Sequence, residues 1–119
     1  MTFTITKEFR FEAAHHLPQM PDGHKCKRPH GHSYLVRVEL ASDKLDAVGF
    51  VEDYGELNDI REYIDTHLDH KDLSELFGGI HTTAERLCRS LFVTFKEAHP
   101  ALRAVTICET PSVSATYRP

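Results

Sequence analysis

The amino-acid sequence predicts an α+β domain in which an antiparallel four-stranded sheet carries two helices on one face, in the order ββααββ. Two stretches near the N-terminus and two near the C-terminus alternate apolar and polar residues, as half-buried strands do. Between them, two stretches repeat apolar residues at helical spacing. With 119 residues, the chain is expected to form a single domain over residues 1–119.

The first two strands are predicted in the N-terminal third of the chain. Residues 2–11 form the first, and its apolar members share one parity: Phe3, Ile5, Phe9 and Phe11. A stretch rich in proline and glycine follows and predicts a loop. Residues 34–40 form the second strand, whose apolar members again alternate: Tyr34, Val36, Val38 and Leu40.

The two helices are predicted from Asp53 onward. Asp53 is the expected N-cap of the first, Glu56 takes the capping-box position, and the apolar stripe follows: Leu57, Ile60, Ile64 and Leu68. Gly78 and Gly79 are predicted to break the chain. Thr82 or Thr83 is the expected cap of the second helix, whose stripe is equally regular: Ala84, Leu87, Leu91, Phe92 and Phe95.

The last two strands are predicted over residues 105–107 and 113–117, where apolar residues again alternate. Pro111 and Ser112 predict the turn between them. Glu109 has the same parity as the apolar residues of the third strand, so its carboxylate is expected to point inward and to need a partner there. The donor edge of a bound heterocycle or an arginine would both serve.

Composition and charge exclude several classes of function. The net charge of −4 argues against nucleic acid as the principal partner, because phosphate backbones require a basic surface. No apolar run approaches the roughly 20 residues that cross a bilayer, and the N-terminus has no signal pattern, so we expect no membrane partner. The three cysteines contain no C-x-x-C pair, which favours a reducing, cytoplasmic location.

Histidines give the sharpest chemical signal. His30 and His32 lie two positions apart at the start of the second strand, so their side chains point to the same side of the sheet. Gly31 between them leaves room for close backbone approach. His15 follows the first strand and can reach the same ion, whereas His16 is expected to face the other way and be exposed. Three histidines without a fourth protein ligand are typical of a catalytic Zn²⁺ site. A chance histidine pair on a polar strand edge is the alternative.

A cysteine with basic neighbours precedes this histidine pair. Lys25, Lys27 and Arg28 are expected to stabilise the thiolate of Cys26, which makes it a candidate base or nucleophile. A fourth zinc ligand is the competing role of Cys26. The same three basic residues are candidates for binding phosphate groups, with a merely solvated loop as the alternative.

Asp69 and His70 form a second candidate pair at the predicted end of the first helix. The carboxylate of Asp69 can orient the imidazole of His70 and set its tautomer, as a proton-transfer histidine requires. A histidine that only caps the helix end is the simpler interpretation.

Taken together, these motifs resemble the family of 6-pyruvoyl-tetrahydropterin synthase and 6-carboxytetrahydropterin synthase. They occur in the family's order over nearly the whole chain: Phe11-Glu12-Ala13-Ala14-His15, Cys26-Lys27-Arg28-Pro29-His30-Gly31-His32, Gly49-Phe50-Val51-Glu52-Asp53-Tyr54, Leu68-Asp69-His70, Thr82-Thr83-Ala84-Glu85 and Cys108-Glu109-Thr110. The resemblance implies the tunnelling fold, and trimers that pair into hexamers with active sites between subunits.

The same resemblance implies roles for the candidate residues. It makes His15, His30 and His32 the zinc ligands, Cys26 the catalytic base, and Asp69 with His70 a proton relay. It also implies a pterin triphosphate substrate, with the ring anchored by Glu109 and with Thr83 and Thr110 among the substrate-binding residues. Whether Cys26 and Glu109 serve the zinc of their own chain or of a neighbour is left open.

The spacing C-x-x-x-H-G-H is similar to that of the bacterial branch of the family, which makes precursors of 7-deazapurines such as queuosine. The expected reaction is a zinc-dependent cleavage of 7,8-dihydroneopterin triphosphate to 6-carboxy-5,6,7,8-tetrahydropterin, acetaldehyde and triphosphate. Three alternatives stay open: a 6-pyruvoyl-tetrahydropterin synthase, an aldolase or epimerase of dihydroneopterin, and a zinc-binding module without catalysis.

Overall fold

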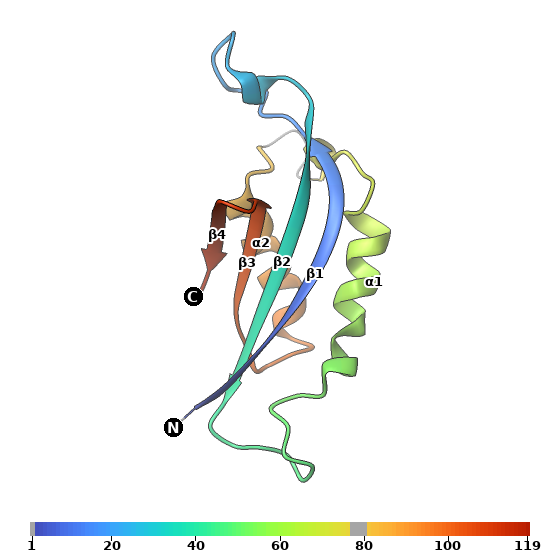
Figure 1. Ribbon diagram of the computed structural model, residues 1–119, viewed down its shortest axis with the longest axis vertical. Helices are drawn as coiled ribbons and strands as arrows, with labels where there is room; N and C mark the ends of the chain where they lie inside the picture. The colour runs from blue at the N-terminus through green and yellow to red at the C-terminus, as the bar shows by residue number, and fades with distance from the viewer. Residues whose placement is uncertain (1, 77–80) are drawn as a thin grey trace.

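The computed structural model describes residues 2–76 and 81–119, and in these it shows four strands and two α-helices in the predicted order (Figure 1). The strands are β1 (Phe3–His15), β2 (His30–Ser42), β3 (Leu102–Thr110) and β4 (Val113–Tyr117). The helices are α1 (Asn58–His67) and α2 (Ala84–Lys96). The strands form one antiparallel sheet in the order β1-β2-β3-β4, which confirms the predicted fold class. The predicted break at Gly78 and Gly79 lies outside the described residues.

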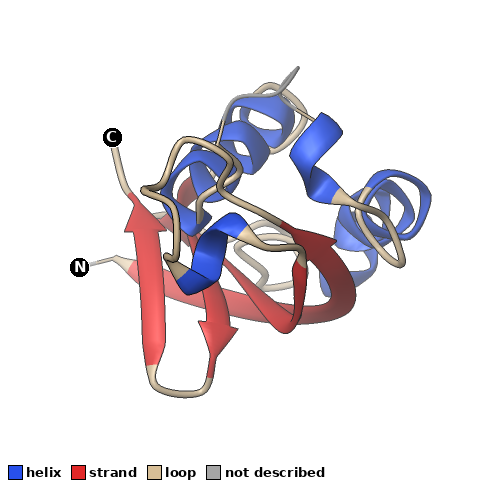
Figure 2. Cartoon of the chain, turned by 90° about the horizontal axis from the view of Figure 1, so that it is seen from above, coloured by secondary structure: helices blue, strands red, loops and turns tan. Residues whose placement is uncertain are grey.

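The hydrophobic core lies between the two helices and one face of the sheet. α1 and α2 lie on the same side of the strands (Figure 2). Alternate residues of the strands and the apolar stripes of the helices fill this space, and the most deeply buried include Val36, Leu40, Ile60, Ile64, Leu91 and Ile107. The described helices include none that is long and apolar enough to cross a membrane.

β1 and β2 are longer than the apolar pattern predicts. Their antiparallel register continues past the paired core residues Phe11 and Tyr34 as far as His15, which lies opposite His30. The pattern ends earlier because polar side chains replace apolar ones on the inward face, although the backbone ladder is unbroken. This end of the sheet therefore presents polar groups on the face that elsewhere builds the core.

The start of α1 differs from the prediction. The Asp53 carboxylate accepts a hydrogen bond from the backbone N–H of Gly55 and so caps a short 3-10 helix, η2 (Tyr54–Leu57). α1 begins only at Asn58. For α2 the prediction is confirmed, because the Thr83 hydroxyl accepts from the N–H of Arg86 at 3.2 Å.

A β-bulge distorts the end of β3. Its register with β4 shifts between Cys108 and Thr110, so Glu109 lies at the irregularity. Bulges change the direction of side chains and are common next to active sites. The bulge places Glu109 beside the polar end of β1 and β2.

Candidate active site

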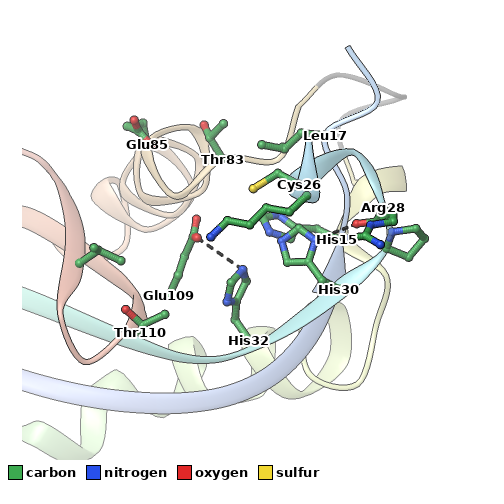
Figure 3. Close-up of a pocket in the computed structure, with 13 residues that line it drawn as sticks. His15, Leu17, Cys26, Arg28, His30, His32, Thr83, Glu85, Glu109 and Thr110 are labelled. Carbon is green, nitrogen blue, oxygen red and sulfur yellow. Dashed lines mark hydrogen bonds and ion pairs between the residues drawn. The ribbon is translucent and has the colours of Figure 1, made fainter. Parts of the chain in front are cut away.

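Three histidines, His15, His30 and His32, form a cluster at the polar end of β1 and β2 (Figure 3). One candidate ligand atom from each ring lies within 4.8 Å of those of the others. The rings stand edge to face, with centroids 4.6 to 5.1 Å apart. This arrangement follows from the register: His15 and His30 face each other across the ladder, and His32 is the next residue on the same face.

Hydrogen bonds orient two of these rings. Nδ1 of His15 lies 3.0 Å from the carbonyl oxygen of Thr82, and Nδ1 of His30 lies 2.8 Å from that of Arg28. A carbonyl oxygen only accepts, so both Nδ1 atoms carry the proton and both Nε2 atoms keep a free lone pair. Nε2 of His32 is buried and has no hydrogen-bond partner among the described residues. This donor set fits a metal ion bound through three imidazole nitrogens.

Burial favours the neutral form of two of these imidazoles, those of His15 and His32. It lowers the pKa of His15 and of His32 because the charged form loses its hydration, and the proximity of His30 lowers both further. The Glu109 carboxylate opposes this shift without reversing it. A neutral imidazole is the form that binds a metal ion, so the environment favours ligation.

The cluster lines a cavity of about 790 Å³, here called the histidine cavity. Cavities of roughly 300–1,000 Å³ accommodate small-molecule ligands. Besides the histidines, its walls include most of the predicted site residues: Lys25, Cys26, Arg28, Thr83, Glu109 and Thr110. The histidine cavity therefore brings together residues from both ends of the chain.

Cys26 lies on a loop that joins β1 to β2. The loop is closed at its base by a 2.7 Å hydrogen bond from the N–H of Leu17 to the carbonyl oxygen of Cys26, and Nδ1 of His24 accepts from the N–H of Cys26. The thiol is free and half-buried, and it lines the same cavity as the histidines of its own chain. Cys26 and Glu109 both face this one cavity, so neither needs a neighbouring chain to approach the cluster.

The basic residues of this loop separate into two groups. Lys25 and Arg28 line the histidine cavity. Lys27 instead forms an ion pair with Asp22 and is not part of the cavity wall. The structure thus brings two of the three predicted phosphate-binding residues to the site.

Glu109 points inward, as its parity in β3 predicts. Its Oε2 atom lies 3.5 Å from Nε2 of His32 (Figure 3). Beside it, Thr110 accepts a hydrogen bond from the N–H of Ser112 in the β3–β4 turn. Tyr34 lies under the cluster, and burial, followed by the charge of Glu109, raises the pKa of its phenol. The site thus combines three imidazoles, a thiol, a carboxylate and two basic side chains.

Comparisons with known proteins identify the family. The family model described as 6-pyruvoyl tetrahydropterin synthase matches residues 4–119. The chain belongs to the 6-pyruvoyl tetrahydropterin synthase family.

Two relatives and one solved structure illustrate the similarity. A 6-carboxy-5,6,7,8-tetrahydropterin synthase of Synechocystis is 39% identical over 95% of this chain and 91% of its own. The Bacillus subtilis protein of the same name is 31% identical over 99% of this chain and 86% of its own. The Caenorhabditis elegans 6-pyruvoyl tetrahydropterin synthase superposes with a TM-score of 0.87 at 27% identity, covering 100% of this chain and 96% of that one. Membership of this family makes the chain an enzyme.

Asp69 and His70 do not line the histidine cavity, although His70 lines a second pocket of the same chain together with His32. Oδ2 of Asp69 is 3.0 Å from Nδ1 of His70, so the predicted pairing is present. Segment 69–72 runs along the outer edge of β1, where the N–H of Glu12 donates to Oδ1 of Asp69. That hydrogen bond is the main reason why the pKa of Asp69 is lowered. The His70 side chain is 79% exposed and has a left-handed backbone with φ 58°.

Several residues near the site were not predicted from the sequence. Leu17, Glu85 and Val113 line the histidine cavity, although Glu85 occurs in a family motif. The apolar pattern of the second strand predicts only a packing role for Tyr34. The one signal of a role at the site is its hydroxyl, which stands in an otherwise apolar row. His16, expected to be exposed, is instead partly buried, because its Nδ1 lies 2.8 Å from Oγ of Ser74.

The expectation for Gly31 is also corrected. A Cβ atom at this position would meet the carbonyl oxygen of Ala13 at 3.5 Å, which is an ordinary van der Waals contact. The backbone of β2 therefore does not require a glycine between the two histidines.

Proposed function

We propose that this enzyme is a zinc-dependent carbon–carbon lyase. It converts 7,8-dihydroneopterin triphosphate and water to 6-carboxy-5,6,7,8-tetrahydropterin, acetaldehyde and triphosphate. The observation that carries this proposal is the convergence of three imidazoles, each with a nitrogen free for a metal, on a cavity that also holds a free thiol. The names of the two bacterial relatives support the carboxy-forming reaction.

His15, His30 and His32 would hold the zinc ion, which acts as a Lewis acid that polarises oxygen atoms of the substrate side chain. The hydrogen bonds to Thr82 and Arg28 keep the rings in the orientation that ligation needs. Glu109 accepts hydrogen bonds from the amino-amidine edge of the pterin, since a carboxylate offers two acceptor oxygens side by side. Thr83 and Thr110 also line the cavity and would contact the ring.

Cys26 is the base in this scheme. Its thiolate removes a carbon-bound proton from the side chain of the substrate, and the cations of Lys25 and Arg28 stabilise the thiolate and bind the triphosphate. The three cysteines carry no disulfide, which fits a reducing compartment, and we infer that the enzyme works in the cytoplasm.

Asp69 and His70 act at the site of a neighbouring copy. The His70 side chain is 79% exposed, so it is accessible to a neighbouring copy, and neither residue lines the histidine cavity of its own chain. We infer a homo-oligomer, a trimer or a pair of trimers, in which one copy completes the cavity of the next. The product would be a precursor of 7-deazapurines such as queuosine.

Substitution of Cys26 tests the proposal. Cys26→Ala is expected to reduce release of acetaldehyde by roughly 10²–10⁴-fold, because the base is lost, while bound zinc stays at one per chain. The half-buried Cys108, which lies outside the cavity, provides the control: Cys108→Ala should retain both activity and zinc. If Cys26→Ala loses its zinc, Cys26 is a metal ligand and the assignment is wrong.

A second function differs only in the fate of the carbon chain. The likeness to the 6-pyruvoyl tetrahydropterin synthase of Caenorhabditis elegans favours elimination of triphosphate without carbon–carbon cleavage. Mass spectrometry of the products distinguishes the two, because only the carboxy-forming reaction releases acetaldehyde. A metal-binding module without catalysis would leave the thiol and Glu109 in the cavity without a role.

A further inference from the structure

The hydroxyl of Tyr34 is buried without a hydrogen-bond partner among the described residues. The side chain is 1% exposed, and its ring stacks on Phe11 with centroids 4.8 Å apart and planes 6° from parallel. A buried hydroxyl without a partner destabilises a folded protein, whereas phenylalanine would fill the same space without this cost. Packing alone therefore does not explain why this residue is a tyrosine and not a phenylalanine.

The position of Tyr34 suggests what the hydroxyl can contact. Its ring lies edge-on to those of His32 and His15, with centroids 5.5 and 6.2 Å apart. Oε2 of Glu109 in turn lies 3.5 Å from Nε2 of His32, so the ring of His32 is next to both Tyr34 and the carboxylate. The phenol is thus a neighbour of both the histidine cluster and the carboxylate.

The Glu109 carboxylate lies within reach of the proposed metal position. Its Oε2 atom already lies 3.5 Å from Nε2 of His32, a nitrogen that has no other partner among the described residues. Carboxylate oxygens bind zinc readily, and a fourth protein ligand would close a site that must stay open for substrate. An open site therefore needs a group that holds this carboxylate back.

We propose that Tyr34 is a positioning residue whose hydroxyl donates a hydrogen bond to Glu109 in the metal-loaded enzyme, which keeps the carboxylate off the metal and directed at the ligand. This inference rests on the metal-binding function proposed above. It explains why a hydroxyl that has no partner in the unligated fold is present under the cluster. It also assigns Tyr34 a role in ligand binding, although Tyr34 is not part of the cavity wall.

Cobalt(II) substitution provides the test, because its visible spectrum reports the number and type of ligands. In Tyr34→Phe we expect a changed spectrum without ligand, cobalt binding at least tenfold tighter, and pterin binding at least tenfold weaker. Apo Tyr34→Phe should unfold a few degrees higher than the apo native protein, because the unpartnered hydroxyl is gone. Tyr117→Phe, which removes the hydroxyl of a ring that packs on Phe92 away from the cluster, is the matched control.

The variant Glu109→Gln provides an independent test of the same inference. If Tyr34 holds Glu109 off the metal, Glu109→Gln leaves the native cobalt spectrum unchanged, and Tyr34→Phe/Glu109→Gln resembles Glu109→Gln alone. A native spectrum that changes in Glu109→Gln would show that the carboxylate is already a ligand and would overturn the inference. So would a Tyr34→Phe protein with native spectrum, cobalt affinity and pterin affinity. A native protein that binds no cobalt at all would instead refute the proposed metal function.

Discussion

At the scale of single residues, Lys25 and Lys27 show how neighbouring positions acquire different roles. Both belong to the 3-10 helix η1 (Lys25–Lys27), but Lys25 lines the histidine cavity while Lys27 is paired with Asp22. An exposed ion pair of this kind contributes little to stability, about 0–1 kcal/mol. Only the first lysine is placed to meet an anionic ligand.

This difference predicts the effect of removing each charge. Lys25→Ala is expected to lower kcat/KM for a triphosphate substrate by roughly 10–100-fold, since a hydrogen bond to a charged group contributes about 1.5–3 kcal/mol. Lys27→Ala serves as the matched control and should change kcat/KM less than about twofold. Steady-state kinetics measure both. Equal losses in the two variants would contradict the assignment of Lys25 to the cavity.

At the scale of elements, a buried histidine joins three separate segments. Nδ1 of His99 lies 2.5 Å from Oε2 of Glu52, and its Nε2 lies 2.7 Å from Oδ2 of Asp59. His99 follows α2, Glu52 precedes η2, and Asp59 lies in the first turn of α1. The His99 side chain is 6% exposed, and both carboxylates contact it in the interior.

These contacts make the charged form of His99 favourable. Burial alone would lower the pKa of His99, but the hydrogen bonds to Asp59 and Glu52 and their negative charges outweigh it, so the pKa is raised. A raised folded-state pKa contributes stability in full below the unfolded value of about 6.5. That contribution is lost as the pH rises through the folded-state value.

The pH dependence of unfolding tests the contacts of His99 with Glu52 and Asp59. His99→Gln is expected to lower the free energy of unfolding by roughly 2 kcal/mol near pH 6, and the difference from the native protein should shrink as the pH increases. His67→Gln is the matched control, because His67 is exposed at the end of α1. Denaturant titrations at several pH values give the result. If the difference in the free energy of unfolding between the native protein and His99→Gln increases toward alkaline pH, the charged form of His99 is not the stabilising one.

Periodicity predicted which elements form but not where they end. It identified both helices and all four strands, because each has a regular apolar side. It ended the first strand at Phe11 and began the second at Tyr34, where the inward residues become polar. It also assigned Asp53 to α1, because a cap residue reads the same in sequence whether an α-helix or a 3-10 turn follows.

The candidate site was predicted to the extent that its residues share a strand face. His15, His30 and His32 follow from strand parity and pairing alone. The contacts of His99 with Glu52 and Asp59 do not, since they join positions 40 and 47 residues apart whose proximity depends on the packing of loops.

At the scale of the whole molecule, the sheet face opposite the helices carries charged and hydroxyl side chains. Ion pairs join Arg37 to Glu8 and Arg118 to Glu39, and the hydroxyls of Thr106 and Thr116 lie 2.7 Å apart. Segment 69–72, which carries Asp69 and His70, covers the outer edge of β1 near Glu12. The proposed assembly would bring this edge to the cavity of the next copy.

Mixed assemblies test whether two copies share a site. Cys26→Ala and His70→Ala chains are each expected to be inactive alone. Unfolded together and refolded as a mixture, they should recover up to about a quarter of native activity, because statistical mixing pairs an intact Cys26 with an intact neighbouring His70 in that fraction of sites. Each variant refolded alone is the control. No recovery in verified mixed assemblies would place both residues in the same copy's site.

The inward face of β1 and β2 passes without interruption from the core to the histidine cluster, with Phe11 and Tyr34 stacked at the boundary. A change in the packing of the interior at this boundary is therefore expected to displace the side chains of the histidine cluster as well. A substitution at Phe11 that changes thermal stability is therefore expected to alter the histidine cluster too. We expect such substitutions to occur together with compensating changes around the cluster.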